Sequence, residues 1–371
     1  GMRMGYSPGS YPMSYRDGNT YRWPDDGVDD FSSDQLQSLY SDGFEGAVDD
    51  PEAEEEWSSS LRFQDFGEVM EEFALNRTSS DSTGLYLPFL DTLKLWSEAK
   101  GYSGSLEELS RNTAANPWHL KQRTGDCVSF AKKNHVCQTR SRDVVDLKEN
   151  ERFITNCDTT MVYSFRGHTG QGASPAKLAN SVKTNGIMLA QDYEVEGYGT
   201  LPLANYKEAI KLGIKWGRTG PPKEIKEVMD DHTVIDVTRV RNRSQLEQAF
   251  RSGLTVSAGS GLGLRNRRDE FGFSVPSGSW NHDMCSGGFD ERPETISKFG
   301  DSAVLIINSW GPGWIRGERK IYNSEYWIPQ GSCWLKTSDY VRICVERGSC
   351  CTMSGMRGWK ALPLKDYGVR I

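Results

Sequence analysis

The apolar residues of this chain change their spacing partway along the sequence. Through residues 127–137 and 174–186 they recur every three or four positions, which predicts helices. Beyond residue 253 they gather in the short runs LTVSAGSG, AVLIINSW and YVRICV, which predict strands. A helical first half followed by a mostly β second half predicts an α+β fold with two lobes and a cleft between them.

Two of the predicted helices carry their own end signals. In SPAKLANSVKTNG, Ser174 is expected to cap the helix, Pro175 to occupy its first turn, and Asn185 and Gly186 to close it. In SQLEQAFRSG (residues 244–253), the serine at the start and the glycine at the end predict the bounds of another helix.

Composition divides the 371 residues into four parts. Residues 1–60 are rich in Tyr, Gly, Ser and Pro and then acidic, so we expect a low-complexity arm. Such an arm becomes ordered only by docking on its own domain or on a partner in an assembly. Residues 61–115 have helical spacing and predict a helical extension. Residues 116–232 are expected to form the helical lobe, and residues 233–371 the β lobe with a C-terminal tail.

Charge and hydropathy exclude several classes of partner. The net charge of −7 argues against nucleic acid as the main partner. No apolar run approaches the roughly 18 residues of a membrane span, and no basic start with an apolar core opens the chain. We therefore expect a soluble protein with no membrane partner and no secretory signal in this sequence. The eight cysteines form no CxxC pair, so we expect no metal and no cofactor.

A candidate nucleophile lies in HLKQRTGDCVSFA (residues 119–131). Cys127 opens a predicted helix, where unpaired backbone N–H groups and the helix dipole favour thiolate over thiol. Gln122 lies five residues upstream. Its side-chain amide and the N–H of Cys127 could together stabilise the oxyanion of a reacting carbonyl. A buried structural cysteine fits this stretch equally well when it is taken alone.

A matching imidazole and amide lie far downstream. His282, in SGSWNHDMCSGGFD, could take the thiol proton and return it to a leaving amine. Asn308 ends the apolar run VLIINSWGPGW, where its amide could hold the second ring nitrogen of that histidine. Trp310 would then cover the His–Asn contact and exclude water from it. The chain's other four histidines have no such sequence setting.

Together, QRTGDC, NHDMCSGG and NSWGPGW resemble the papain-like cysteine peptidases, and the Gly-Asp-Cys triplet is more like that of calpains. The resemblance implies a papain-like two-lobed fold and thiol-dependent hydrolysis of a polypeptide substrate. It also implies the roles of nucleophile for Cys127, acid and base for His282, orienting amide for Asn308 and oxyanion donor for Gln122.

A further stretch extends the resemblance. GHTGQGASPAKLANSVKTNGI is similar to the family's glycine-bearing segment, whose backbone binds the substrate chain in an extended form. On that match, Gly170 and Gly172 would line the part of the cleft that binds residues preceding the scissile bond.

The sequence also departs from the family pattern. The spacing from Gln122 to Cys127 is five residues, one fewer than in papain, and Val128 stands where the family usually has tryptophan. His282 and Asn308 are 26 residues apart, so DERPETISKFGD (residues 290–301) is expected to form an extended hairpin. The family's propeptide signature is not found in residues 1–115, which leaves open an occluding arm or a docking element.

Two other functions fit the same residues. The fold could serve as a structural component of an assembly such as a virus or phage particle, because the arm is of low complexity and no propeptide is recognised. The nucleophile could also pass its acyl group to an amine, as a transferase does, although asparagine as the third member leans away from transglutaminases.

Overall fold

The computed structural model describes ten stretches of the chain, and everything below concerns these alone. They are residues 32–41, 46–55, 103–105, 121–146, 156–230, 233–234, 236–251, 254–311, 313–317 and 331–354. The predicted helices within residues 61–102 and 106–115 therefore lie outside the described residues.

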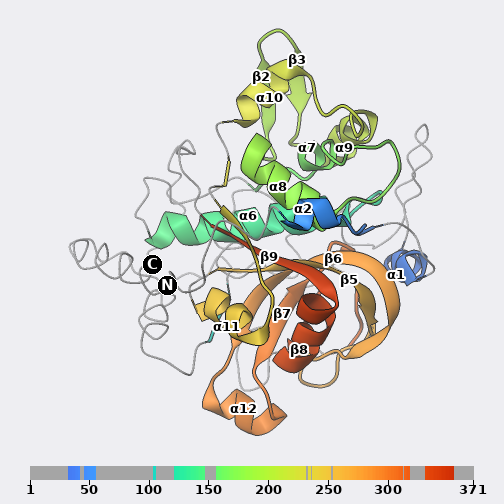
Figure 1. The fold of residues 1–371 in the computed structure, drawn as a ribbon. Coiled ribbons are helices and arrows are strands. Elements are labelled where there is room, and N and C mark those ends of the chain that lie inside the picture. The colour runs from blue at the N-terminus through green and yellow to red at the C-terminus, as the bar shows by residue number, and fades with distance from the viewer. Residues whose placement is uncertain are drawn as a thin grey trace, which may run out of the picture.

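The helical lobe is built around one long helix. It contains α6 (Cys127–Asp146), α7 (Thr160–Tyr163), α8 (Pro175–Asn185), α9 (Tyr206–Lys215), α10 (Lys223–Met229) and the antiparallel hairpin of β2 (Asp192–Val195) and β3 (Gly199–Pro202). Helix α6 lies between the smaller helices and the main sheet, so one face of it belongs to each lobe (Figure 1). Ser174 caps α8 by accepting a hydrogen bond from the N–H of Lys177, and Gly186 closes it, as predicted.

The β lobe is one antiparallel sheet of seven strands, in the order β4-β9-β5-β6-β7-β8 with β1 paired to β6. The strands are β1 (Ser103–Ser105), β4 (Asp236–Arg239), β5 (Ser257–Leu264), β6 (Pro276–Asp290), β7 (Ala303–Ile307), β8 (Ser332–Lys336) and β9 (Gly348–Ser354). The helices of this lobe are α11 (Arg243–Arg251), α12 (Pro293–Phe299), α13 (Thr337–Tyr340) and the π-helix η4 (Val341–Glu346). The sheet curves around α13 and η4 (Figure 1). The expected α+β class is confirmed.

The main hydrophobic core crosses from one lobe to the other. It joins Val128 of α6 and Leu178 of α8 to Val256, Trp310 and Met353 of the β lobe. A smaller core under α7, α9 and α10 includes Met161, Met188, Leu201, Ala209 and Ile225. Because α6 packs on both sides, its N-terminal end is held at the boundary between the lobes.

Three local predictions were wrong. Residues 293–299 form helix α12 where an extended hairpin was expected, because Pro293 starts the helix and Gly300 ends it in the left-handed conformation. The run YVRICV is helical, and its apolar side chains are buried in the curve of the sheet. The cap of α11 is Asn242, whose Oδ1 accepts from the N–H of Gln245 at 2.9 Å, and Ser244 lies inside the helix.

Parts of the N-terminal region dock on the chain's own domain. Helix α1 (Ser33–Ser41) lies against the β lobe, where Leu36 is buried, and α2 (Pro51–Glu55) lies beside α8 (Figure 1). Within residues 61–115, the described piece is strand β1, not helix. The domain boundaries expected from composition remain predictions.

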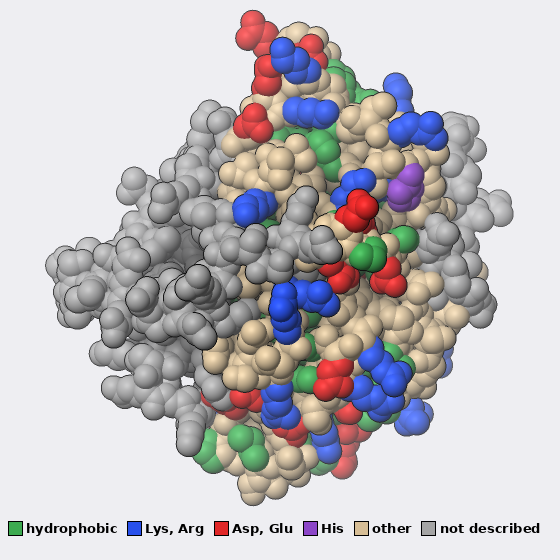
Figure 2. Space-filling view, viewed as in Figure 1, with side chains coloured by type: hydrophobic (Ala, Val, Ile, Leu, Met, Phe, Trp, Pro, Cys, Tyr) green, Lys and Arg blue, Asp and Glu red, His purple; other side chains and the backbone are tan. Residues whose placement is uncertain are grey.

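Charged side chains of both signs are interspersed on the face shown in Figure 2. None of the helices in the described residues is long and apolar enough to cross a membrane.

Candidate active site

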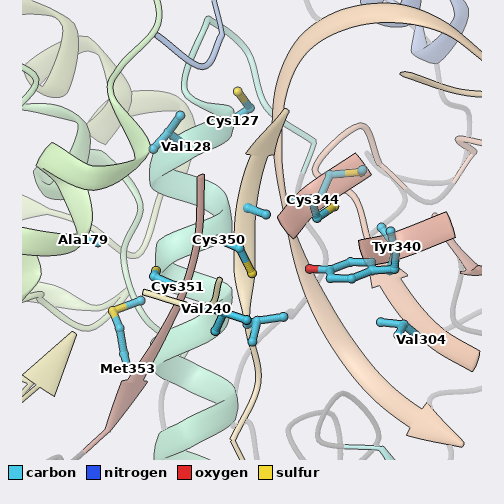
Figure 3. Close-up of a cluster of buried hydrophobic side chains, with 14 of the residues drawn as sticks. Cys127, Val128, Ala179, Val240, Val304, Tyr340, Cys344, Cys350, Cys351 and Met353 are labelled. Carbon is cyan, nitrogen blue, oxygen red and sulfur yellow. The ribbon is translucent and has the colours of Figure 1, made fainter. Parts of the chain in front are cut away.

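Cys127 is the first residue of α6 and is fully buried. Figure 3 shows it at the start of the helix, while Cys350 and Cys351 of β9 lie beside a later part of the same helix. The first turn of a helix has N–H groups without a partner within the helix and the positive end of the helix dipole, and both favour a thiolate at this position. None of the eight cysteines forms a disulfide with another described residue.

The residue before Cys127 is a buried carboxyl group. The hydroxyl of Tyr206 donates to Asp126 Oδ2 at 2.6 Å, and the same hydroxyl accepts from the N–H of Arg123 at 3.0 Å. Burial raises the pKa of Asp126 to about 7, even though its hydrogen bonds and Arg166 favour the charged form. This pair ties the loop before the nucleophile to α9.

Gln122 is buried and its amide is held at both ends. Its Oε1 accepts from the Ser309 hydroxyl at 2.7 Å, and its Nε2 donates to the Thr124 carbonyl at 2.8 Å. The Thr124 carbonyl only accepts, so this bond fixes which end of the amide is the nitrogen. An amide nitrogen carries two hydrogens, so one bond to Thr124 does not use its whole donor capacity.

His282 lies on β6 with its ring fixed by Asn308. Its Nε2 is 2.7 Å from Asn308 Oδ1, and that same oxygen accepts from the N–H of Ser309 at 2.7 Å. Because Oδ1 only accepts, His282 Nε2 carries the hydrogen, and the lone pair of the neutral ring is on Nδ1. Burial lowers the pKa of His282 to about 3, although the bond to Asn308 raises it, so the ring is neutral.

Two indoles enclose this imidazole. Trp310 stacks on His282 with ring centroids 4.3 Å apart, and Trp280 meets the ring edge-on at 5.2 Å. Both indoles are buried. The stacked Trp310 covers the His–Asn contact and keeps water from competing for it.

Cross-lobe contacts bring the two halves of the site to one boundary. The N–H of Gln122 donates to the Ser309 carbonyl at 2.8 Å, and Lys121 bridges Trp310 in an antiparallel pairing. On the other side of Cys127, Lys132 of α6 lies 3.1 Å from Asp283, the residue after His282. The segment that carries Cys127, from Lys121 to Lys132, is therefore attached at both ends to the parts of the β lobe next to Asn308 and His282.

Lys132 and Asp283 form an ion pair in which both side chains are fully buried. Burial raises the pKa of Asp283 to about 6, and Lys132 opposes that shift. Burial also disfavours the charge on Lys132, but Asp283 and the nearby thiols together raise its pKa. Lys132 further donates to the Ser257 hydroxyl at 2.9 Å. The pair is thus charged near neutral pH.

The predicted substrate-binding glycines lie close to the nucleophile loop. The N–H of Gly172 donates to the Gly125 carbonyl at 3.1 Å, and Gly170 is exposed, with its carbonyl accepting from Arg166. The neighbouring Ala173 pairs instead with Ala47 of the arm, in a parallel bridge. Its N–H donates to the Gly46 carbonyl and its carbonyl accepts from the N–H of Val48, both at 2.9 Å.

Sequence reasoning missed the residues that support the site. Ser309 follows Asn308 in the sequence, so its hydroxyl could have been predicted to lie near the site and to bond to Gln122. The pairings of Lys132 with Asp283 and of Asp126 with Tyr206 join residues 151 and 80 positions apart, for which the sequence offers no signal. Ala173 was missed because only its backbone takes part.

No group of His, Cys, Asp and Glu in the described part of the chain is placed to hold a metal ion. Each predicted catalytic residue is described and buried, namely Gln122, Cys127, His282 and Asn308, as is Trp310. The contact between His282 and Asn308 has the predicted geometry, while the catalytic roles themselves stay predictions.

Comparison with known proteins gives structural likeness only. No family model matches the chain, and no curated protein matches it. Xylellain, a cysteine protease from Xylella fastidiosa, is 15% identical, with coverage of 73% of this chain and 91% of that one and a TM-score of 0.44. The Carica candamarcensis cysteine protease CMS1MS2, in complex with E-64, is 17% identical, with 68% and 98% covered and a TM-score of 0.40.

A third solved structure is similar over a larger share of this chain. Digestive procathepsin L 3 of Tenebrio molitor larval midgut is 13% identical, with 87% of this chain and 99% of that chain covered and a TM-score of 0.38. The chain is thus similar in structure to these three proteins, at low identity and with TM-scores below 0.5. At these scores the functional conclusion depends on the residues of this chain.

Proposed function

We propose that this protein is a cysteine peptidase that hydrolyses peptide or isopeptide bonds with Cys127 as its nucleophile. The observation that carries the proposal is the fixed ring of His282, with its N–H on Asn308 and its lone pair on Nδ1. A neutral imidazole in this tautomer is able to accept a proton from a thiol. The start of α6, at the same boundary between the lobes, supplies that thiol.

The reaction would proceed in two halves. His282 Nδ1 takes the proton of Cys127, the sulfur attacks the peptide carbonyl, and the same proton passes to the leaving amine. Water then attacks the thioester with His282 as base, and the acid product leaves as the thiol is regenerated. Asn308 holds the ring in place while it gains and loses its proton.

Gln122 would supply one donor for the oxyanion, beside the N–H of Cys127. Its bond to Ser309 orients the amide before substrate arrives, so no reorganisation is needed in the transition state. A donor of this kind contributes about 3 kcal/mol to transition-state stability. The Thr124 carbonyl takes one of the hydrogens of this amide.

We further propose that residues 46–48 lie where a substrate chain would bind, between the helical lobe and the β lobe. Besides its bonds to Ala173, this segment donates from the N–H of Ala47 to the carbonyl of Asn281, beside His282, at 3.2 Å. Residues 46–48 of the arm are therefore an occluding element that has to leave before a polypeptide substrate enters. Gly170 and Gly172 would shape the groove next to Ala173.

Hydrolysis of unstructured polypeptides by the purified full chain tests the proposal. Cys127→Ser is expected to abolish cleavage, whereas Cys333→Ala, at another buried cysteine, is expected to leave it unchanged per folded molecule. Cleavage that survives Cys127→Ser would contradict the assignment. Adding a primary amine and analysing the products separates hydrolysis from acyl transfer.

The second candidate is a structural component of an assembly, with latent or lost peptidase activity. It is favoured by the full burial of Cys127 and by the docking of residues 46–48 on Ala173 and Asn281. A chain that stays uncleaved and unreactive after Ala47 has been replaced by a bulky residue would support this candidate over the peptidase.

A further inference from the structure

Ala47 lies in a narrow space between the two lobes. Its backbone pairs with the chain around Ala173 on one side and with the carbonyl of Asn281 on the other. Its side chain is half-buried, whereas that of the next residue, Val48, is 39% exposed. A backbone and one inward side chain thus occupy the groove in the way an extended peptide would.

The walls of this space are Gly259 of β5 and Pro175 of α8. A Cβ added to Gly259 would lie 2.5 Å from Pro175 Cγ and 3.1 Å from the Cβ of Ala47. The first distance is too short for any side chain at position 259. Pro175 is not able to move far from Gly259, because its ring is rigid and it occupies the capped first turn of α8. Residue 259 therefore has to be a glycine for β5 to lie this close to both Pro175 and the methyl group of Ala47.

The side of the sheet next to Gly259 is filled by another residue. Asp283 stands directly opposite Gly259 in the β5–β6 register, so both residues face the same side of the sheet. Its carboxylate is engaged by Lys132 from α6, and both side chains are fully buried. A larger side chain in the groove would have to push against this buried pair, and separating such a pair is costly.

We infer that the space between Gly259 and Pro175 is a substrate side-chain subsite that accepts only glycine, alanine or serine in the residue that pairs with Ala173. This inference rests on the proposed peptidase function and names the class of polypeptide that the site would cleave. Gly259 and Pro175 are its specificity-determining residues, and Ala47 fits because its side chain is a single methyl group.

The arm itself provides a test that needs no catalysis. In the full chain, Ala47→Ser is expected to leave hydrogen exchange at the N–H groups of Val48 and Ala173 unchanged. Ala47→Leu is expected to speed exchange there at least about tenfold, because the larger side chain expels the segment. Val48→Leu, at an exposed side chain, is the control and is expected to change nothing. Protection that survives Ala47→Leu would overturn the subsite.

Peptide libraries varied at each position before the scissile bond test the same subsite in substrates. The full chain is expected to show one position where leucine or phenylalanine lowers kcat/KM at least about 100-fold relative to alanine. Gly259→Ala is expected to remove the acceptance of alanine there and keep that of glycine, and Pro175→Ala to admit valine. Gly261→Ala is the matched control, since its Cβ would lie an ordinary 3.6 Å from the Trp280 carbonyl.

The outcomes separate the two proposals. Cleavage with leucine or phenylalanine accepted at every position, or Gly259→Ala behaving like Gly261→Ala, would overturn the subsite and leave the peptidase standing. If no library is cleaved, even by the Ala47→Leu chain, but exchange responds to Ala47→Leu as expected, the peptidase proposal fails, while the size limit of the groove stands.

Discussion

Two buried histidines of this molecule have the same burial and opposite chemistry. His135, on α6, accepts at Nε2 from the N–H of Met353 at 3.1 Å, so its Nδ1 carries the hydrogen and donates to the Ser257 hydroxyl at 2.9 Å. The lone pair of His135 therefore accepts a hydrogen bond from the backbone. In His282, Nε2 donates its hydrogen to Asn308, and the lone pair is on Nδ1. The partner that holds the ring decides whether it is able to act as a base.

The pKa values of both rings follow from burial rather than from this difference. Burial lowers the pKa of His135 well below its usual value, with the charge of Lys132 adding to the effect, and burial lowers that of His282 to about 3. Each ring binds protons more readily in the unfolded chain, so each removes stability as the pH falls below about 6.5. A lowered pKa therefore does not distinguish a base from a structural histidine.

The largest expected effect breaks the comparison directly. His282→Ala is expected to lower kcat/KM for peptide hydrolysis by at least about 10³-fold, because no other group takes the thiol proton. His135→Ala is expected to cost about 1–3 kcal/mol of stability by leaving the N–H of Met353 without its acceptor, with kcat per folded molecule unchanged. Steady-state kinetics and denaturant unfolding on both variants measure this. Equal kinetic losses would show that the two rings do not differ in role.

The next effect concerns the oxyanion donor. Gln122→Ala is expected to lower kcat about 10²–10³-fold with KM little changed, because the donor acts mainly in the transition state. Ser309→Ala, which removes only the bond that orients this amide, is expected to have a smaller effect in the same direction. A loss expressed in KM alone would contradict an oxyanion role for Gln122.

The buried pair of Lys132 and Asp283 links the surroundings of both histidines. Asp283→Leu is expected to destabilise the fold by about 3–5 kcal/mol, because it leaves the Lys132 ammonium buried without its carboxylate. Adding Lys132→Met is expected to restore most of that stability, since both charges are then gone. Urea unfolding of the single and double variants checks this. A double variant less stable than Asp283→Leu would show that the pair's charges are not what matters.

The smallest expected effect is a change in stability with pH that depends on Asp126, a second buried group that titrates beside the site. Folded Asp126, with a pKa of about 7, binds a proton more readily than the unfolded chain does, whose value is near 3.8. The wild-type free energy of unfolding therefore falls as the pH rises from 4 to 7. Asp126→Asn has no carboxyl group to titrate and keeps an acceptor for Tyr206. The difference in the free energy of unfolding between this variant and the wild type is therefore expected to shift in favour of the variant by roughly 2–4 kcal/mol across that range. An advantage independent of pH would contradict the buried, protonated carboxyl group.

The sequence predicted those parts of the molecule that depend on local pattern. Helix α8 with its cap, the start of α6 at Cys127 and the strands β5 and β7 follow from periodicity and end signals. The contact between His282 and Asn308 was predicted from residue types alone. Helix α12 was missed, although Pro293 and Gly300 are both helix-end signals, because the region was interpreted only as a connection between strands.

What the sequence could not predict depends on contacts between distant segments. YVRICV has the composition of a strand, yet it lies inside the curve of the sheet, where tertiary packing overrides local preference. The placement of Ala47 beside Gly259 and Pro175 joins three segments of the chain through small side chains and backbone. Such residues carry no chemical signature, so only the folded structure reveals them.

The central claim is that Cys127 is activated by His282, and covalent labelling tests it most directly. The intact protein is treated with an epoxide thiol trap, and the product is located by peptide mass spectrometry. One label per chain at Cys127, absent in His282→Ala and retained in His135→Ala, is the predicted result. Equal labelling of Cys127 with and without His282, or labelling spread over the other buried cysteines, would contradict it.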